Sequence, residues 1–375
     1  MREVKPIKVG VLGDAGADFG WTDPAVEPYN LWRDFVDGLR LTFDEVEDQL
    51  DRRIEMVVRV ADGLPRGEGR EVIQAWQELV DEGCIVVFGP CVSENAVTLR
   101  EHIESVGHVP TLSWAGSENW PGQWCFALNN GSLTEEPPVL VNILAQDSIH
   151  TVGVLVGRSL IGNEYLEGFR AACPVEGVEI VSEVRVPQTE TDKVRAVSTL
   201  RDANPDALVC LGNGFELWGI NDAMASIGWH VPRYTNTAFV LAYYRREWMA
   251  NLAGWIGLDQ YDERNETGQQ FLDRFQARYG RRPEFYGPLY AHDGGRVIGR
   301  ALATATPLSP RGVMEALERV KLMPAACGTP GTRISFGKWL RRGWMGTGYL
   351  VARQVSEDGT TTTFRGSLGP PVRRG

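Results

Sequence analysis

Two short stretches decide the fold: IKVGVLG, residues 7–13, and its later counterpart TVGVLVG, residues 151–157. Each is a continuous apolar run, which is typical of a parallel strand covered on both faces. After each run the chain alternates between amphipathic segments and further short apolar runs. Such alternation predicts right-handed βαβ units and a parallel sheet. Its restart at 151 predicts a second sheet of the same kind.

The expected elements follow the spacing of apolar residues, with steps of three and four for helices and unbroken runs for strands. In the first half we expect strands at 7–13, 54–60, 84–89 and 109–114, with helices at 29–50, 68–82 and 93–106. In the second we expect strands at 151–157, 178–184, 206–212 and 232–237, with helices at 161–172, 190–203 and 215–228. Later helices are expected at 265–279, 287–303 and 310–319, and late strands within 332–339 and 348–354.

Length and net charge limit the classes of function that this chain can have. A chain of 375 residues is too long for one ordinary core and suits two lobes. A net charge of −11, with no clustered basic face, argues against a nucleic-acid partner. No stretch reaches the roughly 18–20 apolar residues of a membrane helix, so we expect no membrane insertion.

The N-terminus bears on localisation. MREVKPIKVGVLGD has no apolar signal region ahead of its first strand. As the sequence stands, this predicts a cytoplasmic protein. If a signal was trimmed, the protein is periplasmic or at the cell surface.

The six cysteines are expected to be core thiols of a reduced protein. Cys84 and Cys91 lie at opposite ends of a predicted strand, about 23 Å apart, too far to bridge. A pairing such as Cys91–Cys125 stays open. No CxxC and no cysteine–histidine metal spacing occurs, so we expect neither a metal nor a cofactor.

Catalytic motifs are missing from the sequence. GNGFEL, residues 212–217, begins like a dinucleotide fingerprint but has Leu217 in the place of the third glycine. There is no P-loop, no HExxH and no GxSxG elbow, and the five histidines are scattered. The sequence therefore favours a binding protein over an enzyme.

Seven segments in order carry a family resemblance: IKVGVLGD, VVFGPCVSENAV, HVPTLSWAGSE, VGVLVGRSLIGNEYLEGFR, NPDALVCLGNGFE, FQARYGRRPEFYGPLYAHDGGRVIGRAL and ISFGKWLRRG. Together they resemble the type I periplasmic solute-binding proteins, specifically the leucine/isoleucine/valine-binding group of ABC transporter receptors. The resemblance covers nearly the whole chain and implies two doubly wound parallel-sheet lobes joined by a three-stranded hinge. A ligand would then bind in a cleft between the lobes, outside the carboxyl ends of the strands.

The resemblance also sets expected domain boundaries, with crossings near 128–134, 254–260 and 328–336. Lobe 1 is expected to comprise 1–130 plus 258–330, and lobe 2 to comprise 131–257 plus 331–365. The Pro/Gly/Arg-rich segment 366–375 is expected to be a disordered tail.

Ser93, in FGPCVSENAV (88–97), has two interpretations. It follows a strand and Pro90, so its hydroxyl suits the N-cap of a helix. The exposed amides at such a helix start also attract a carboxylate or another electron-rich group. In the family the equivalent serine touches the ligand, which favours a ligand contact here.

The loop LSWAGSENW (112–120) follows the next strand. By itself it is an ordinary turn. The family carries here a small-residue segment ending in a hydroxyl that grips the ligand's head group, and Ala115, Gly116 and Ser117 match it. Small residues let backbone amides approach a ligand closely.

The second lobe matches the family less well. Where the family has an aromatic before a glycine, this chain has Ile161, and a further family aromatic corresponds to the loop with Asn213 and Phe215. Where amino-acid binders place a carboxylate against the ligand's ammonium, the loop TNTAF offers neutral Asn236 and Thr237. A buried ammonium without a counter-charge costs several kcal/mol, which argues against a branched-chain amino acid ligand.

Aromatic residues are frequent in the predicted loops, either as core residues or as ligand contacts: Trp21, Trp114, Trp120, Phe215, Phe239 and Tyr243. They favour a ligand with an apolar or aromatic body and one polar or acidic end. Arg158 is the candidate counter-charge for that end. Two roles stay open: the substrate-binding component of an ABC uptake transporter that works with a permease, or a cytoplasmic sensor that signals to a regulatory protein.

Overall fold

The computed structural model describes residues 5–14, 31–50, 52–65, 67–186, 192–244 and 246–367, and divides the chain into two compact units. Unit 1 comprises Met1–Asn130 and Tyr261–Tyr349, and unit 2 comprises Gly131–Gln260 and Leu350–Gly375. Each unit is built on a doubly wound sheet, so the predicted α/β fold class is confirmed.

The sheet of unit 1 has five parallel strands among the described residues. Their order across the sheet is β2 (Ile54–Val60), β1 (Ile7–Gly13), β3 (Val87–Phe88), β4 (Thr111–Ser113) and β5 (Cys125–Ala127). The winding reverses between β1 and β3, which makes the loops after these two strands the expected place for a ligand.

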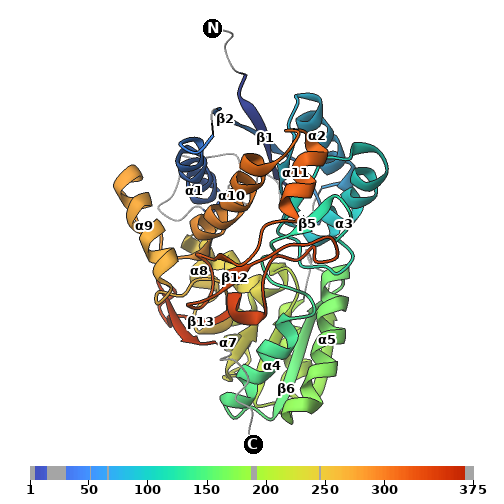
Figure 1. The fold of residues 1–375 in the computed structure, drawn as a ribbon. Coiled ribbons are helices and arrows are strands. Elements are labelled where there is room, and N and C mark those ends of the chain that lie inside the picture. The colour runs from blue at the N-terminus through green and yellow to red at the C-terminus, as the bar shows by residue number, and fades with distance from the viewer. Residues whose placement is uncertain are drawn as a thin grey trace, which may run out of the picture. The chain divides into compact units, whose positions relative to one another are not determined.

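Helices cover both faces of this sheet (Figure 1). They are α1 (Leu31–Glu47), α2 (Gly69–Asp81), α3 (Ser93–His102, continued by a π-helical turn), α9 (Glu266–Tyr279), α10 (Tyr286–Thr304) and α11 (Pro310–Leu317). Gly10 of β1 leaves room for the Leu79 side chain of α2, which packs on one face. On the opposite face the Phe88 ring meets Phe35 of α1 and lies directly under Gly294 of α10.

The sheet of unit 2 repeats the same winding. Its order is β14 (Thr362–Gly366), β13 (Val351–Val355), β10 (Trp255–Asp259), β9 (Arg233–Thr235), β8 (Ala207–Leu211), β6 (Thr151–Gly157) and β7 (Glu179–Val186). The strands from β7 to β10 are parallel, and β13 and β14 extend the sheet antiparallel. Here the reversal falls between β6 and β8.

The helices of unit 2 are α4 (Glu136–Gln146), α5 (Leu160–Glu176), α6 (Lys193–Arg201), α7 (Ile220–Ser226) and α8 (Arg246–Asn251). Two 3₁₀ segments, Phe215–Leu217 and Thr237–Tyr243, follow β8 and β9. Ser159 caps the start of α5 by accepting a hydrogen bond from the Gly162 amide, and left-handed Gly177 (φ 72°) ends it. The sequence analysis did not predict α4, which begins with two prolines and is apolar on most sides.

The third passage of the chain between units falls at Tyr349–Leu350, later than the expected 328–336. Residues 333–345 stay with unit 1, because the Ala127 amide donates to the Arg341 carbonyl (2.7 Å) and Phe336 packs edge-on against Phe126. The short pair β11 (Met323–Pro324) and β12 (Arg333–Ile334) also belongs to this part. Gly366 ends β14, and the rest of the expected tail from 368 lies outside the described residues.

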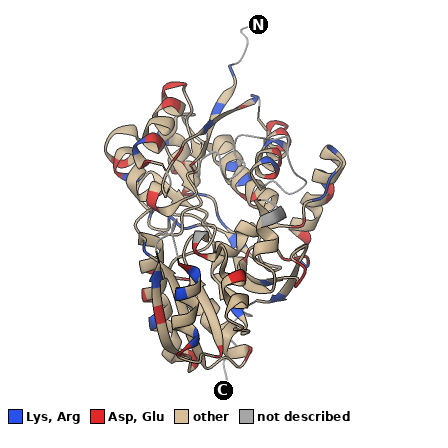
Figure 2. Ribbon diagram, turned by 180° about the vertical axis from the view of Figure 1, so that it is seen from behind, with Lys and Arg blue, Asp and Glu red and all other residues tan. Residues whose placement is uncertain are grey.

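None of the described helices is both long and apolar enough to span a bilayer. Figure 2 shows acidic and basic positions interspersed over the ribbons of both units.

Candidate functional site

The first group of site residues lies where β1 and β3 of unit 1 end. Asp14 follows β1, and its buried carboxylate accepts hydrogen bonds from the amides of Cys91 (2.8 Å) and Val92 (3.0 Å). It also accepts one from the Asn95 side chain (3.0 Å). Burial raises the pKa of Asp14, and these hydrogen bonds act in the opposite direction. Asp14 therefore fixes the loop after β3 from the end of the neighbouring strand.

Ser93 is not the N-cap that the sequence suggested. It is the first residue of α3, Val92 takes the cap position, and no side chain caps that helix start. The Ser93 hydroxyl instead accepts a hydrogen bond from the Gly116 amide at 3.2 Å. No described residue accepts a hydrogen bond from this hydroxyl in turn. Ser93 thus joins the loops after β3 and β4 and keeps one donor for another group.

The segment Ala115–Gly116–Ser117 is buried and largely paired. The Ala115 amide donates to the Ser113 hydroxyl (2.9 Å), as the Gly116 amide does to Ser93. The Gly116 carbonyl accepts from the Arg342 guanidinium at 2.8 Å. The amides of Ala115 and Gly116, which were expected to bind a ligand, therefore already donate to side chains of this unit. A ligand would have to share them.

The tryptophans of this loop differ in kind. Trp120 is fully buried and its indole N–H donates to the Phe126 carbonyl (2.8 Å), which makes it a core residue. Trp114 packs against Phe35 (4.5 Å between ring centroids) and Tyr290 (4.9 Å). The buried Trp114 indole N–H has no hydrogen-bond partner among the described residues. Trp21, also a predicted contact, lies outside those residues.

In unit 2, Arg158 and Ile161 follow β6. The Arg158 side chain is exposed, while its backbone amide donates to the Val186 carbonyl (2.8 Å). Ile161 is buried in the first turn of α5. Arg158 is therefore available to solvent or to a ligand, whereas Ile161 contributes to the helix packing.

The loops after β8 and β9 are tied together by Asn236. Its side-chain amide donates to the Gly212 carbonyl (2.8 Å), and its side-chain oxygen accepts from the Gly212 amide (3.3 Å). Half-buried Asn213 and the backbone of Phe215 follow Gly212 in the same loop. Asn236 thus has a structural role whether or not it also contacts a ligand.

Phe239 belongs to the core of unit 2. Its ring lies so close to Gly257 of β10 that a Cβ there would approach it to 2.4 Å. It also meets Tyr243 edge-on at 6.2 Å. A loop position in sequence did not distinguish a ring that faces a ligand from one that covers a strand.

A buried carboxylate that sequence reasoning missed lies beside Thr237. Glu136, the first residue of α4, accepts hydrogen bonds from the Thr237 amide (2.7 Å) and hydroxyl (2.9 Å). It also accepts from the Tyr165 hydroxyl at 2.6 Å. Burial raises the pKa of Glu136 to about 8, although these hydrogen bonds lower it. The loop after β9 is neutral in sequence, as predicted, but α4 supplies a carboxylate to it.

Gly131 leaves the space for this cluster. A Cβ on Gly131 would lie 1.9 Å from a Glu136 oxygen and 2.3 Å from the Thr237 hydroxyl. The signal in the sequence was EEPP at 135–138, an acidic pair directly before a helix that starts with proline. That signal predicts a helix start, but not the partner about 100 residues later.

A second buried carboxylate, Glu216, lies at the reversal point of unit 2. It accepts a hydrogen bond from the Gly214 amide (3.0 Å). Gly157, which ends β6, and Gly212, which follows β8, both leave room for it, since a Cβ on either would approach its carboxylate oxygens to 2.7 Å or less. Two buried carboxylates, Glu136 and Glu216, therefore lie beside the strand ends of unit 2.

The described residues contain no cluster of three or more His, Cys, Asp or Glu suited to a metal ion. All six cysteines are free thiols, so the alternative Cys91–Cys125 bridge is not present. Five of them are buried and Cys91 is half-buried. The apolar surroundings raise the pKa of Cys210 well above its usual value, as expected of a core thiol rather than a nucleophile.

Comparisons with known proteins agree with this architecture. A family model described as periplasmic binding protein matches residues 6–347, so the chain belongs to that family. Among the solved structures similar to it are a leucine-binding protein and a substrate-binding protein of a branched-chain amino acid transporter in complex with isoleucine, the latter from Streptococcus pneumoniae. A search of curated proteins finds no match.

Two solved structures illustrate the likeness of fold. The leucine-binding protein LivK of Thermotoga maritima has a TM-score of 0.79 and 15% identity, over 97% of this chain and 99% of that one. A solute-binding protein of R. palustris in complex with benzoate has a TM-score of 0.75 and 14% identity, over 98% and 97%. At such identity the likeness shows the fold, and the ligand must be argued from the residues of this chain.

Proposed function

We propose that this protein captures a small organic ligand with an apolar or aromatic body and one polar or acidic end, and delivers it to the permease of an ABC uptake transporter. No catalytic step is assigned to it. The ligand contacts the strand-end loops of both units, and binding brings these loops to closure around it. The sections of chain that pass between the units act as the hinge.

The observation that carries the proposal is a pair of unused donors beside aromatic rings in unit 1. The Ser93 hydroxyl and the Trp114 indole N–H are both buried and donate to no described residue. A buried donor without an acceptor costs about 1–3 kcal/mol. A ligand carboxylate or carbonyl would satisfy such donors, and the rings around Trp114 would cover an apolar body.

The chemistry of unit 2 separates two ligand classes. Exposed Arg158 would favour an acidic end. Glu136 would instead favour an ammonium, because a nearby cation stabilises the ionised carboxylate. Glu136 already accepts three hydrogen bonds from its own unit, so we favour the acid without an ammonium. The benzoate complex among the similar structures is an example of such a ligand in this fold.

A thermal-shift panel tests the ligand class. Benzoate, substituted benzoates and alicyclic acids should raise the melting temperature of the purified protein, because a ligand that binds only the folded state stabilises it. Leucine, isoleucine and valine should have a smaller effect. Tight calorimetric binding of leucine, with none of the acids, would contradict the ligand assignment while leaving the transport role intact.

The transport role has its own test. We expect the ligand-loaded protein to stimulate the ATPase of its permease complex in proteoliposomes, and the unliganded protein to stimulate it less. Genes for a permease and an ATPase beside this one would identify the complex to use. If the loaded protein binds a regulatory protein instead and leaves the ATPase unchanged, the chain is a sensor of the same fold.

A further inference from the structure

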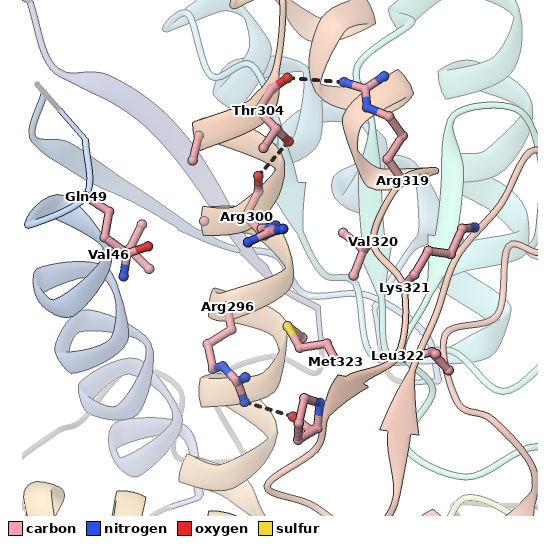
Figure 3. Close-up of a pocket in the computed structure, with 13 residues that line it drawn as sticks. Val46, Gln49, Arg296, Arg300, Thr304, Arg319, Val320, Lys321, Leu322 and Met323 are labelled. Carbon is pink, nitrogen blue, oxygen red and sulfur yellow. Dashed lines mark hydrogen bonds between the residues drawn. The ribbon is translucent and has the colours of Figure 1, made fainter.

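Unit 1 contains a hollow that is distant from the loops at the carboxyl ends of its strands. It is a groove with a cavity volume of about 510 Å³, bounded by the end of α1, the last turns of α10 and the segment 319–324 after α11. Figure 3 shows these three walls. The first half of α10 carries Tyr290 against Trp114 of the candidate site, so the groove lies at the other end of the helix. We call it the arginine groove.

Close packing of two helices places the arginines. A Cβ on Gly295 or Gly299 of α10 would approach Thr42 or Val46 of α1 to 2.9 Å and 2.6 Å. With glycines facing α1, the neighbouring face of α10 presents Arg296 and Arg300, one turn apart, along the groove (Figure 3). Arg319 reaches toward α10 from the opposite wall.

Two of the three guanidinium groups are positioned by hydrogen bonds to carbonyl oxygens. Arg296 donates to the Pro324 carbonyl (2.9 Å) and Arg319 to the Thr304 carbonyl (3.1 Å). The Arg300 side chain has no hydrogen-bond or ion-pair partner among the described residues. None of the described residues that line the groove is Asp or Glu. The fourth basic residue, Lys321, turns away to the Phe336 carbonyl.

Nearby negative charge does not neutralise this group. Asp293 lies 3.9 Å from Arg296, but its buried carboxylate is already occupied by the amides of Ala326 and Cys327. The end of α10 contributes only about half a negative charge. Arginines four residues apart on one helix repel each other. The three arginine side chains that line the groove are therefore under-compensated in a chain whose net charge is −11.

We propose that the arginine groove binds a small polyanion that carries phosphate or polyphosphate groups. The planar fork of each guanidinium matches two phosphate oxygens, and three forks suit a chain of linked phosphates. The volume lies within the range of small-molecule sites, about 300–1,000 Å³. The site does not depend on the proposed transport role, because it shares no residue with the loops that would hold the transported ligand.

Isothermal calorimetry with tripolyphosphate tests the site in the full chain. At about 50 mM salt we expect saturable binding with one equivalent per chain, weakening as salt screens the charges. Arg300→Gln should weaken binding about tenfold, the loss of one charge-assisted contact. Because this exposed side chain makes no hydrogen bond or ion pair with a described residue, the variant should fold normally. Arg296→Gln combined with Arg300→Gln should weaken binding further.

The matched control is Arg195→Gln on the exposed face of α6, where the arginine side chain is 82% exposed and pairs with Asp192. Loss of affinity in Arg300→Gln but not in Arg195→Gln supports the groove. No saturable heat from tripolyphosphate, or equal weakening by both substitutions, overturns the proposal.

Two further experiments distinguish a lipid headgroup from a free phosphate compound and from an acidic peptide. Vesicles of anionic phospholipid that bind the protein, and release it when tripolyphosphate is added, indicate a lipid headgroup; vesicles that do not bind indicate a free polyanion. Either result supports the proposal. A hexaglutamate peptide that binds the groove more tightly than tripolyphosphate would overturn it in favour of an acidic protein segment.

Discussion

The two units wind their sheets in the same order, yet they place opposite chemistry at the strand ends. Unit 1 presents unused donors there, the Ser93 hydroxyl and the Trp114 indole N–H. The Asp14 carboxylate fixes the loop that precedes Ser93 by accepting hydrogen bonds from its amides. Unit 2 presents buried carboxylates, Glu136 and Glu216. One architecture therefore sets where a site forms, while single residues set which end of a ligand each unit can accept.

The largest expected effect concerns the acidic side of this comparison. The folded-state pKa of Glu136 is raised to about 8 from 4.5, so the folded protein binds the proton more tightly than the unfolded chain. Its protonation therefore stabilises the fold fully below about pH 4.5, and this stability is lost as pH rises toward about 8. We expect the loss to reach about 5 kcal/mol over that window.

Urea unfolding of the wild type and of Glu136→Gln at several pH values measures this effect. The glutamine stays neutral, so the variant should lose less unfolding free energy than the wild type between about pH 5 and 8. Asp206→Asn is the control, since Asp206 is an exposed carboxylate whose pKa is lowered by amides. Equal slopes for wild type and Glu136→Gln would show that Glu136 is ionised in the folded protein well below neutral pH.

The second prediction tests whether the loop after β3, which carries Ser93, depends on Asp14 for its stability. Asp14→Ala removes the acceptor of the Cys91 and Val92 amides and of the Asn95 side chain. Each buried donor left unsatisfied costs about 1–3 kcal/mol, so we expect a loss of about 3 kcal/mol in the free energy of unfolding. Asp14→Asn, which keeps one acceptor oxygen, should lose less. A loss below about 1 kcal/mol in Asp14→Ala would mean that the loop is held by other contacts.

Much of the fold was predictable because a doubly covered strand needs a continuous apolar run. β1 and β6 have the predicted bounds for this reason, and the edge strand β2 also has its predicted bounds. The strands β3 and β4 are shorter than expected, because only the middle of each apolar run pairs with a neighbour. Helix α4 was missed because its apolar residues follow no single face.

The places of the candidate residues at strand ends were predictable, but their hydrogen-bond partners were not. Ser93 and the segment 115–117 lie at the ends of β3 and β4, as the spacing implied. Which partner each side chain chooses depends on residues distant in sequence. Ser93 pairs with Gly116 rather than with its own helix, and Thr237 meets Glu136 from a segment 101 residues earlier. No local pattern encodes such pairs.

The third prediction measures how much the Ser93 hydroxyl contributes to ligand affinity. Ser93→Ala removes a hydroxyl that would donate to the ligand, and we expect about 3- to 10-fold weaker binding of the best acid in the thermal-shift panel. The control is Ser198→Ala, a half-buried serine on α6 whose hydroxyl bonds only within its own helix. Calorimetry on both variants decides the point. If Ser93→Ala binds like the wild type but melts earlier, the hydroxyl only joins the two loops.

The smallest expected effect belongs to Arg158. Its side chain is exposed, and an ion pair in water contributes only about 0.2–1 kcal/mol because solvent and salt screen it. Arg158→Gln should therefore weaken binding of an acidic ligand by about two- to fivefold at low salt, and hardly at all near 0.5 M salt. A neutral ligand of the same shape, such as the amide of the acid, should bind both forms equally. If Arg158→Gln weakens the acid more than tenfold, solvent must be excluded around this side chain when the ligand binds, and Arg158 then joins Ser93 as a principal contact. If binding is unchanged at every salt concentration, the acidic end is held by the donors of unit 1 alone, and the asymmetry between the two units is sharper than their shared winding suggests.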